Sequence, residues 1–138
     1  MIDDTTPAHT FTIPSNVPAV ALLGPADDFL RVIARASGCL VSAVSYTEAS
    51  LVLAGRIGDQ AAWRGLDALV RRAAMSIVPH NADLALVARE AFLRFGKGRH
   101  PAALNFGDCA SYALAKSRGL PLLYKGGDFS ATDLVSAA

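Results

Sequence analysis

The stretch NFGDCASYALAKSRGLPLLYKGGDF, residues 105–129, carries the pattern that decides the fold. Residues 105–108 lead into a helix that we predict over 109–118. Gly119 ends this helix, because glycine readily adopts the left-handed conformation common at helix C-termini. An apolar strand is predicted directly afterwards, over 121–124. A helix followed within a few residues by a buried strand is typical of a parallel sheet covered by helices.

The same alternation of strands and helices extends over the rest of the chain. Some segments repeat apolar residues at helical spacing, whereas others are short, apolar and bounded by proline or glycine. This alternation favours an α/β fold, with a central parallel sheet flanked by helices, in a single domain over residues 1–138. The predicted strands are 10–13, 40–44, 75–78 and 121–124, and the predicted helices lie between Pro18 and Gly38, between Ser45 and Gly58, over 60–74, from the cap Asn81 to Phe95, and over 109–118.

The helix after strand 40–44 carries an acidic residue near its start. Ser45 or Thr47 is expected to cap this helix, since both hydroxyls can accept a hydrogen bond from a backbone N–H. Either cap places Glu48 in the first turn, where a negative charge is stabilised by the helix dipole. The residues expected on the buried face of the helix are Leu51, Val52 and Ala54.

The composition is that of a globular protein and excludes a disordered chain. Hydrophobic residues make up 52% and charged residues 18% of the 138 residues. No apolar run approaches the ~18–20 residues of a membrane span, and no N-terminal stretch has the pattern of a signal peptide. Cys39 and Cys109 lie in apolar segments without metal-ligand spacing. We therefore expect reduced, buried thiols and a cytoplasmic location.

Charge is unevenly distributed, although the net charge is only +1. The first 28 residues contain four aspartates and no lysine or arginine. Residues 89–125 carry a local basic excess, which attracts phosphate but is also typical of a solvated helix face. The basic residues of this segment are Arg89, Arg94, Lys97, Arg99, Lys116, Arg118 and Lys125, against the acids Glu90 and Asp108.

Three acids follow predicted strands or begin predicted helices. They are Glu48, Asp108 and Asp128, which are far apart in the sequence. In a parallel α/β sheet such positions converge beyond the carboxyl ends of the strands. Carboxylate oxygens are the ligands that Mg²⁺ prefers, and a metal relieves the repulsion of clustered acids. The same residues also suit helix first turns and a glycine turn, so position alone leaves both interpretations open.

Two longer stretches distinguish these interpretations. They are VSAVSYTEASLVL at 41–53 and FGKGRHPAALNFGDCASYALAKSRGLPLLYKGGDF at 95–129, in which LNFGDCASYALA and LLYKGGDF are long and specific strings. Both resemble VapC toxins, the PIN-domain ribonucleases of type II toxin–antitoxin systems, and the similarity covers roughly 22–134. The resemblance implies a PIN-like three-layer α/β fold and cleavage of RNA phosphodiesters with Mg²⁺ or Mn²⁺ held by a quartet of acids.

On this resemblance Glu48, Asp108 and Asp128 are expected to be catalytic, metal-binding residues. Lys125 and Arg99 flank the acids in sequence and are candidates for binding RNA phosphates. The family also implies a VapB-type antitoxin and a homodimer as partners, with no membrane attachment. Ser111 is expected either to orient Asp108 or to bond its own backbone.

The N-terminus departs from the family pattern. Members usually begin with a strand that runs into an Asp-Thr-Ser-like or Asp-Ala-Ser-like motif, whose aspartate is the first metal ligand. Pro14 stands at that place here, and proline offers neither a side-chain oxygen nor an N–H. Asp4, in the string DTT, is a second candidate for this ligand, and its use would require an insertion before the first predicted helix. Residues 1–12 are expected to be an atypical N-terminal extension of the single domain.

Three interpretations therefore stand at the level of sequence. The first is a metal-dependent endoribonuclease toxin. The second is a catalytically impaired PIN-like binding module, which Pro14 favours. The third is another acidic α/β protein, such as a phosphatase or a receiver domain, but a receiver requires an acidic pair where Ile13 and Pro14 stand.

Overall fold

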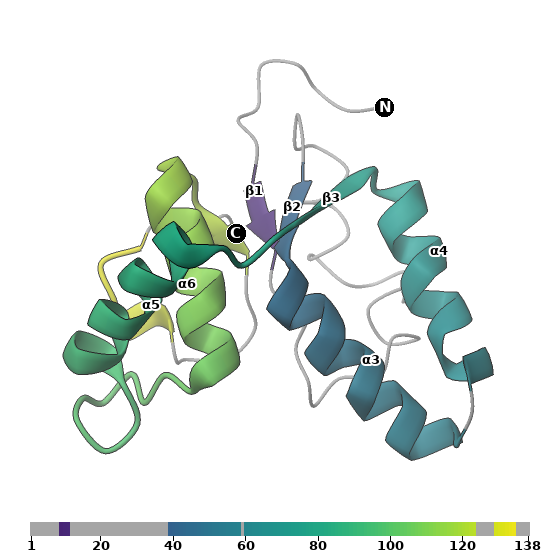
Figure 1. The fold of residues 1–138 in the computed structure, drawn as a ribbon, viewed down its shortest axis with the longest axis horizontal. Coiled ribbons are helices and arrows are strands. Elements are labelled where there is room, and N and C mark those ends of the chain that lie inside the picture. The colour runs from purple at the N-terminus through teal and green to yellow at the C-terminus, as the bar shows by residue number, and fades with distance from the viewer. Residues whose placement is uncertain (1–8, 12–38, 59, 124–128, 135–138) are drawn as a thin grey trace.

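A computed structural model describes residues 9–11, 39–58, 60–123 and 129–134, and shows strands with helices on both sides (Figure 1). The predicted helix between Pro18 and Gly38 lies outside the described residues. In chain order the elements are β1 His9–Phe11, β2 Cys39–Ser42, α3 Ala43–Ile57, the 3₁₀ helix η1 Gln60–Trp63, α4 Arg64–Arg72, β3 Met75–Val78, α5 Ala82–Phe95, α6 Phe106–Arg118, β4 Leu122–Leu123 and the 3₁₀ helix η2 Phe129–Ala131.

The described strands form one parallel sheet in the order β3-β2-β1-β4. Phe11 pairs with Val41 on one side and with Leu123 on the other. Helices α5 and α6 lie together on one side of the strands, and α3 and α4 lie on the other (Figure 1). The predicted α/β fold with a parallel sheet between helices is confirmed. Because all four strands run the same way, their carboxyl ends share one edge.

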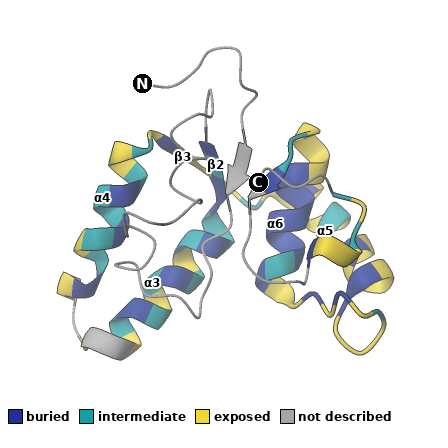
Figure 2. Ribbon diagram, turned by 180° about the vertical axis from the view of Figure 1, so that it is seen from behind, coloured by how far each residue is buried: buried dark blue, intermediate teal, exposed yellow. Residues whose placement is uncertain are grey.

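Helix α6 is the centre of the packing. Eight of its 13 residues are buried, and Figure 2 shows its middle in the colour of buried residues and its last turn exposed. The central stretch of α6, from Cys109 to Ala115, is buried on every side, and α6 contacts α5, α3 and the strands. One core cluster joins α6 to α5, to the loop after α5, to β4 and to η2. Its larger members are Phe95, Leu104, Tyr112, Leu122 and Phe129.

Helix α3 begins earlier than the sequence predicted. Its cap is Ser42, whose hydroxyl accepts a hydrogen bond from the N–H of Val44 at 3.2 Å, so neither Ser45 nor Thr47 caps it. Ser42 also ends β2, so the strand passes into the helix without a loop and stops short of the predicted Val44. Glu48 consequently lies in the second turn rather than the first.

The buried face of α3 also differs from the predicted one. Leu51 is 66% exposed, whereas Ala49 and Leu53 are buried. The buried stripe follows Ser45, Ala49 and Leu53, which are spaced four residues apart and therefore share one face of the helix.

Helix α6 also begins before the predicted residue 109. Asn105 caps it in a capping box, in which the Asn105 side chain accepts from the N–H of Asp108 and the Asp108 side chain accepts from the N–H of Asn105. This exchange brings Phe106 and Gly107 into the first turn. The prediction that Asp108 lies at the start of the helix is confirmed.

Several local predictions are confirmed. Strand β3 has the predicted bounds, Asn81 caps α5, and Gly58 and Gly119 end their helices with φ of 92° and 63°. Neither cysteine forms a disulfide, and both are buried. Among the described helices, none has the length and apolar character that a membrane crossing requires.

Candidate active site

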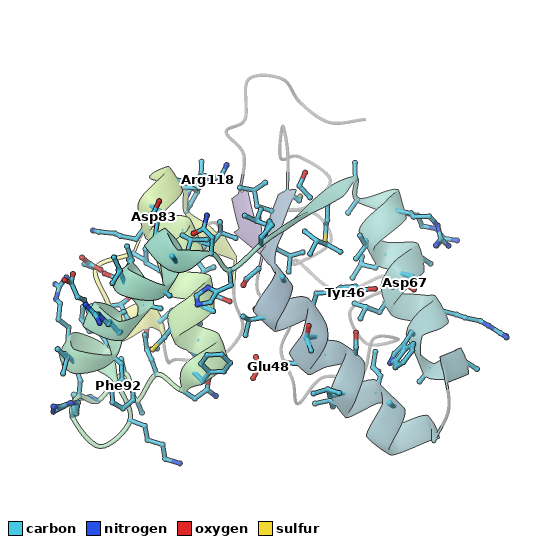
Figure 3. All side chains as sticks on the ribbon, viewed as in Figure 1. Tyr46, Glu48, Asp67, Asp83, Phe92 and Arg118 are labelled. Carbon is cyan, nitrogen blue, oxygen red and sulfur yellow. The ribbon has the colours of Figure 1, made fainter. Side chains whose placement is uncertain are left out.

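The side chain of Glu48 points from α3 toward α6, away from the neighbouring Tyr46 (Figure 3). Its carboxylate lies directly against the Cα of Gly107. A β-carbon at Gly107 would overlap Oε1 of Glu48, with Cδ and Oε2 also too close. Glycine is therefore the residue that allows this acid to reach the start of α6.

Asp108, the residue after Gly107, brings a second negative charge to the same place. Burial first, and then the charge of Asp108, raises the pKa of the Glu48 carboxyl above its ordinary value. Within the described part of the chain, no residue donates a hydrogen bond or forms an ion pair with Glu48. The site thus brings two carboxylates together, and no described cation balances Glu48.

Local backbone bonds hold Asp108 in place. Its Oδ2 accepts from the N–H of Asn105 at 3.0 Å, and its own N–H donates to Asn105 Oδ1 at 2.9 Å. Burial and the charge of Asp108 also raise the pKa of the adjacent Cys109 to about 11. The Cys109 thiol is therefore protonated at neutral pH, which excludes it as a thiolate nucleophile.

On the sheet side of the two acids, the interface between α3 and α6 contains a buried pair of hydroxyls. Ser45 Oγ and Ser111 Oγ lie 2.8 Å apart. Ser111 was expected to orient Asp108 or to bond its own backbone, but its partner in the structure is a serine on another helix. The sequence could not predict this contact, because it depends on how closely two helices approach.

The chemistry of the Glu48 and Asp108 pair fits a divalent cation. Two carboxylates whose charges disfavour each other gain from a hard cation that accepts oxygen ligands. No group of three or more aspartate, glutamate, histidine or cysteine side chains with metal-binding geometry occurs among residues the structure describes. Asp4 and Asp128, the other predicted ligands, lie outside those residues.

The structure describes only some of the other residues that bear on the predicted site. Arg99 is exposed on the loop between α5 and α6, the loop that leads to Asp108, whereas Lys125 and Pro14 lie outside the described residues. His100 Nδ1 accepts from the N–H of Ala102 at 3.0 Å, and its ring packs edge-on against Phe95. This histidine stabilises the loop.

Sequence reasoning missed Gly107 and Ser45. One signal for Ser45 was available, since it precedes Glu48 by one helical turn just as Ser111 follows Asp108 by one turn. For Gly107, the glycine directly before a helix-starting acid was visible, but nothing in the sequence showed that a glutamate from α3 would lie against it.

Comparison with known proteins agrees with this fold. The PIN domain matches residues 20–134. The chain therefore belongs to the PIN-domain family, and its predicted VapC-type resemblance is confirmed.

Two relatives and one solved structure illustrate the match. Ribonuclease VapC30 of Mycobacterium tuberculosis is 50% identical over 99 residues, which are 72% of this chain and 75% of the relative. Ribonuclease VapC of Mycolicibacterium smegmatis is 48% identical over 96 residues, 70% and 74% of the two chains. The crystal structure of M. tuberculosis VapC20, a sarcin-ricin loop cleaving toxin, shares the fold with a TM-score of 0.65 at 23% identity, over 92% of this chain and 96% of the other.

Proposed function

We propose that this protein is a metal-dependent endoribonuclease toxin that hydrolyses RNA phosphodiester bonds, with Glu48 and Asp108 in its active site. The observation that carries the proposal is the approach of these two acids, from separate helices, at the carboxyl edge of a parallel sheet. The VapC ribonucleases among its relatives support the same activity.

Glu48, Asp108 and Asp128 are the proposed metal ligands, with Asp4 as a candidate fourth and Mg²⁺ or Mn²⁺ as the ion. When bound, such an ion neutralises charge on the scissile phosphate and lowers the pKa of a water molecule. The donor set is composed of carboxylates, the chemistry that these hard cations select.

The protein's own residues prepare this site. Gly107 leaves the space in which the Glu48 carboxylate lies, and the capping box fixes Asp108. Partial burial of Glu48 strengthens its interaction with a cation, because less water screens the charges. Arg99 and Lys125 are proposed to bind phosphate oxygens of the RNA.

We further infer a VapB-type antitoxin and a homodimer as partners, and a cytoplasmic location. Apolar side chains exposed on α5 support a protein partner, since exposed apolar surface often marks an interface. They are Leu86, Phe92 and Leu93, at 49%, 41% and 62% exposed. The two cysteines, neither of which forms a disulfide, support a reducing compartment.

One sequence feature favours a second function, that of a catalytically impaired PIN-like binding module. Pro14 stands where the family has its first acid, and loss of one ligand weakens a metal site. The two functions differ in a single measurable property, metal-dependent cleavage.

The test is incubation of the antitoxin-free protein with structured RNA and Mg²⁺ or Mn²⁺. We expect cleavage that requires the metal and that falls by about 10²-fold or more in Asp108→Asn. The matched control is Asp67→Asn on α4, an acid-to-amide change that leaves an oxygen to accept the hydrogen bond from Tyr46. An absence of cleavage by correctly folded wild-type protein would refute the ribonuclease and support the binding module.

A further inference from the structure

We propose that Ser45 and Ser111 are positioning residues, whose mutual hydrogen bond sets the spacing between Glu48 and Asp108. This inference rests on the proposed function, because the spacing matters only if the two acids hold a metal. The two serine hydroxyls contact each other rather than the carboxylates of Glu48 and Asp108, so their proposed role is to position those acids.

The contact between the two serines is short and fully buried. The two Oγ atoms lie 2.8 Å apart, and the residues are 2% and 0% exposed. A hydroxyl buried without a partner costs free energy, so each serine needs the other at this place. On α6 the residues on either side of Ser111 in the sequence, Ala110 and Tyr112, are also buried.

The spacing along both helices aligns the hydroxyl pair with the acid pair. Ser45 precedes Glu48 by three residues on α3, and Ser111 follows Asp108 by three on α6. Residues three apart share a helix face. The two helices run in roughly opposite directions, α3 away from the sheet and α6 toward it (Figure 1). Both serines therefore lie on the sheet side of the acids, about one turn away.

The hydrogen bond between Ser45 and Ser111 limits how far α3 and α6 can separate. The like charges of Glu48 and Asp108 repel each other and push the ends of α3 and α6 apart. The hydrogen bond between Ser45 and Ser111, about one helical turn away on the sheet side, resists that separation. Two small residues at the interface, Ser45 and Gly107, allow the helices to approach closely enough for it to form.

A purely structural hydrogen bond would also be buried and satisfied, so the test must separate stability from positioning. Single Ser45→Ala or Ser111→Ala changes leave one buried hydroxyl without its partner and destabilise the fold. The double variant Ser45→Ala/Ser111→Ala removes both hydroxyls, and replacing both partners by apolar groups is nearly neutral for stability. Its thermal midpoint should return toward that of the wild type.

In contrast to the thermal midpoint, the Mn²⁺ affinity of the double variant should stay below that of the wild type. It is measured by titration calorimetry on the full chain. We expect the double variant to bind Mn²⁺ about tenfold more weakly than the wild type at nearly equal stability. The control Ser50→Ala removes a hydroxyl on α3 that bonds only the carbonyl of Tyr46 in its own helix, and should leave affinity unchanged. Wild-type affinity in the double variant would overturn the proposal.

A second readout requires no metal. Spin labels at Leu51→Cys and Ser117→Cys, both exposed positions, report the separation of α3 and α6. The distance distribution should broaden in the double serine variant but not with Ser50→Ala, and an unchanged distribution would refute the positioning role. Wild-type protein that takes up no Mn²⁺ would instead refute the metal part of the proposed function, while the label distances still decide the role of the serines.

Discussion

Helix α3 presents a carboxylate contact on each of two sides, and the two contacts have opposite character (Figure 3). Toward α4, the hydroxyl of Tyr46 donates to Oδ1 of Asp67, and Trp63 Nε1 donates to the carbonyl of Ser50 at 2.8 Å. Toward α6, Glu48 meets Asp108, a group of the same charge. One side pairs a donor with an acceptor, whereas the other places two acceptors together.

A third carboxylate, that of Asp133, has hydrogen-bond donors beside it. Asp133 accepts from the Tyr112 hydroxyl at 2.7 Å and from Lys116 Nζ at 2.9 Å. Burial raises the pKa of Asp133, but these hydrogen bonds outweigh burial and lower it below its ordinary value. Asp67 and Asp133 each accept a hydrogen bond from a tyrosine, whereas the contact between Glu48 and Asp108 joins two acids. We propose that this difference marks the functional site.

The largest expected effect comes from removing the space beside Glu48. In Gly107→Ala the new β-carbon overlaps the end of a flexible side chain, so Glu48 moves while the backbone stays. We expect RNA cleavage to fall by about 10²-fold, the cost of misplacing a catalytic group by about 1 Å. The thermal midpoint should change little. A variant that keeps full activity would show that the position of Glu48 is unimportant.

On the side of α3 that faces α4, we expect a substitution to lower stability and leave activity unchanged. Tyr46→Phe removes the donor to the half-buried Asp67 and should cost about 1–2 kcal/mol of unfolding free energy, measured by urea denaturation. Cleavage per folded molecule should match the wild type. A loss of activity at unchanged stability would mean that both sides of α3 serve the site.

The smallest effect is a pH dependence carried by Glu48. Because the folded pKa of this acid is raised above the ordinary 4.5, the folded state holds its proton to higher pH than the unfolded state. The contribution of Glu48 to stability should therefore fall as pH rises from about 4.5 through the raised folded value. Urea denaturation of metal-free protein measures it as the difference between wild type and Glu48→Gln. A difference that stays constant with pH would contradict the opposed-charge description.

Local signals in the sequence were sufficient for much of the fold. Asn81, Gly58 and Gly119 identified helix ends through their own backbone chemistry, and the apolar segment at Met75–Val78 identified a strand. The start of α3 was predicted wrongly, because Ser42, Ser45 and Thr47 can all cap a helix. The choice among them depends on where β2 stops pairing with its neighbours, which is a tertiary property.

The site could be predicted only in part for a similar reason. The acids Glu48 and Asp108 were identified from their positions and from the family resemblance, but their contact across Gly107 depends on the packing of two helices. The Ser45 and Ser111 contact depends on the same packing. The catalytic and metal-binding roles of Glu48 and Asp108 remain predictions, as do the roles of Asp4, Asp128, Lys125 and Arg99.

The central claim is that Glu48 and Asp108 are opposed because they bind a divalent metal together. Calorimetric titration of Mn²⁺ into wild type, Glu48→Gln and the control Asp67→Asn tests it most directly. We predict that the wild type and Asp67→Asn bind with the same affinity, and that Glu48→Gln binds at least about tenfold more weakly. Equal affinity in all three proteins, or no binding by the wild type, would contradict the claim.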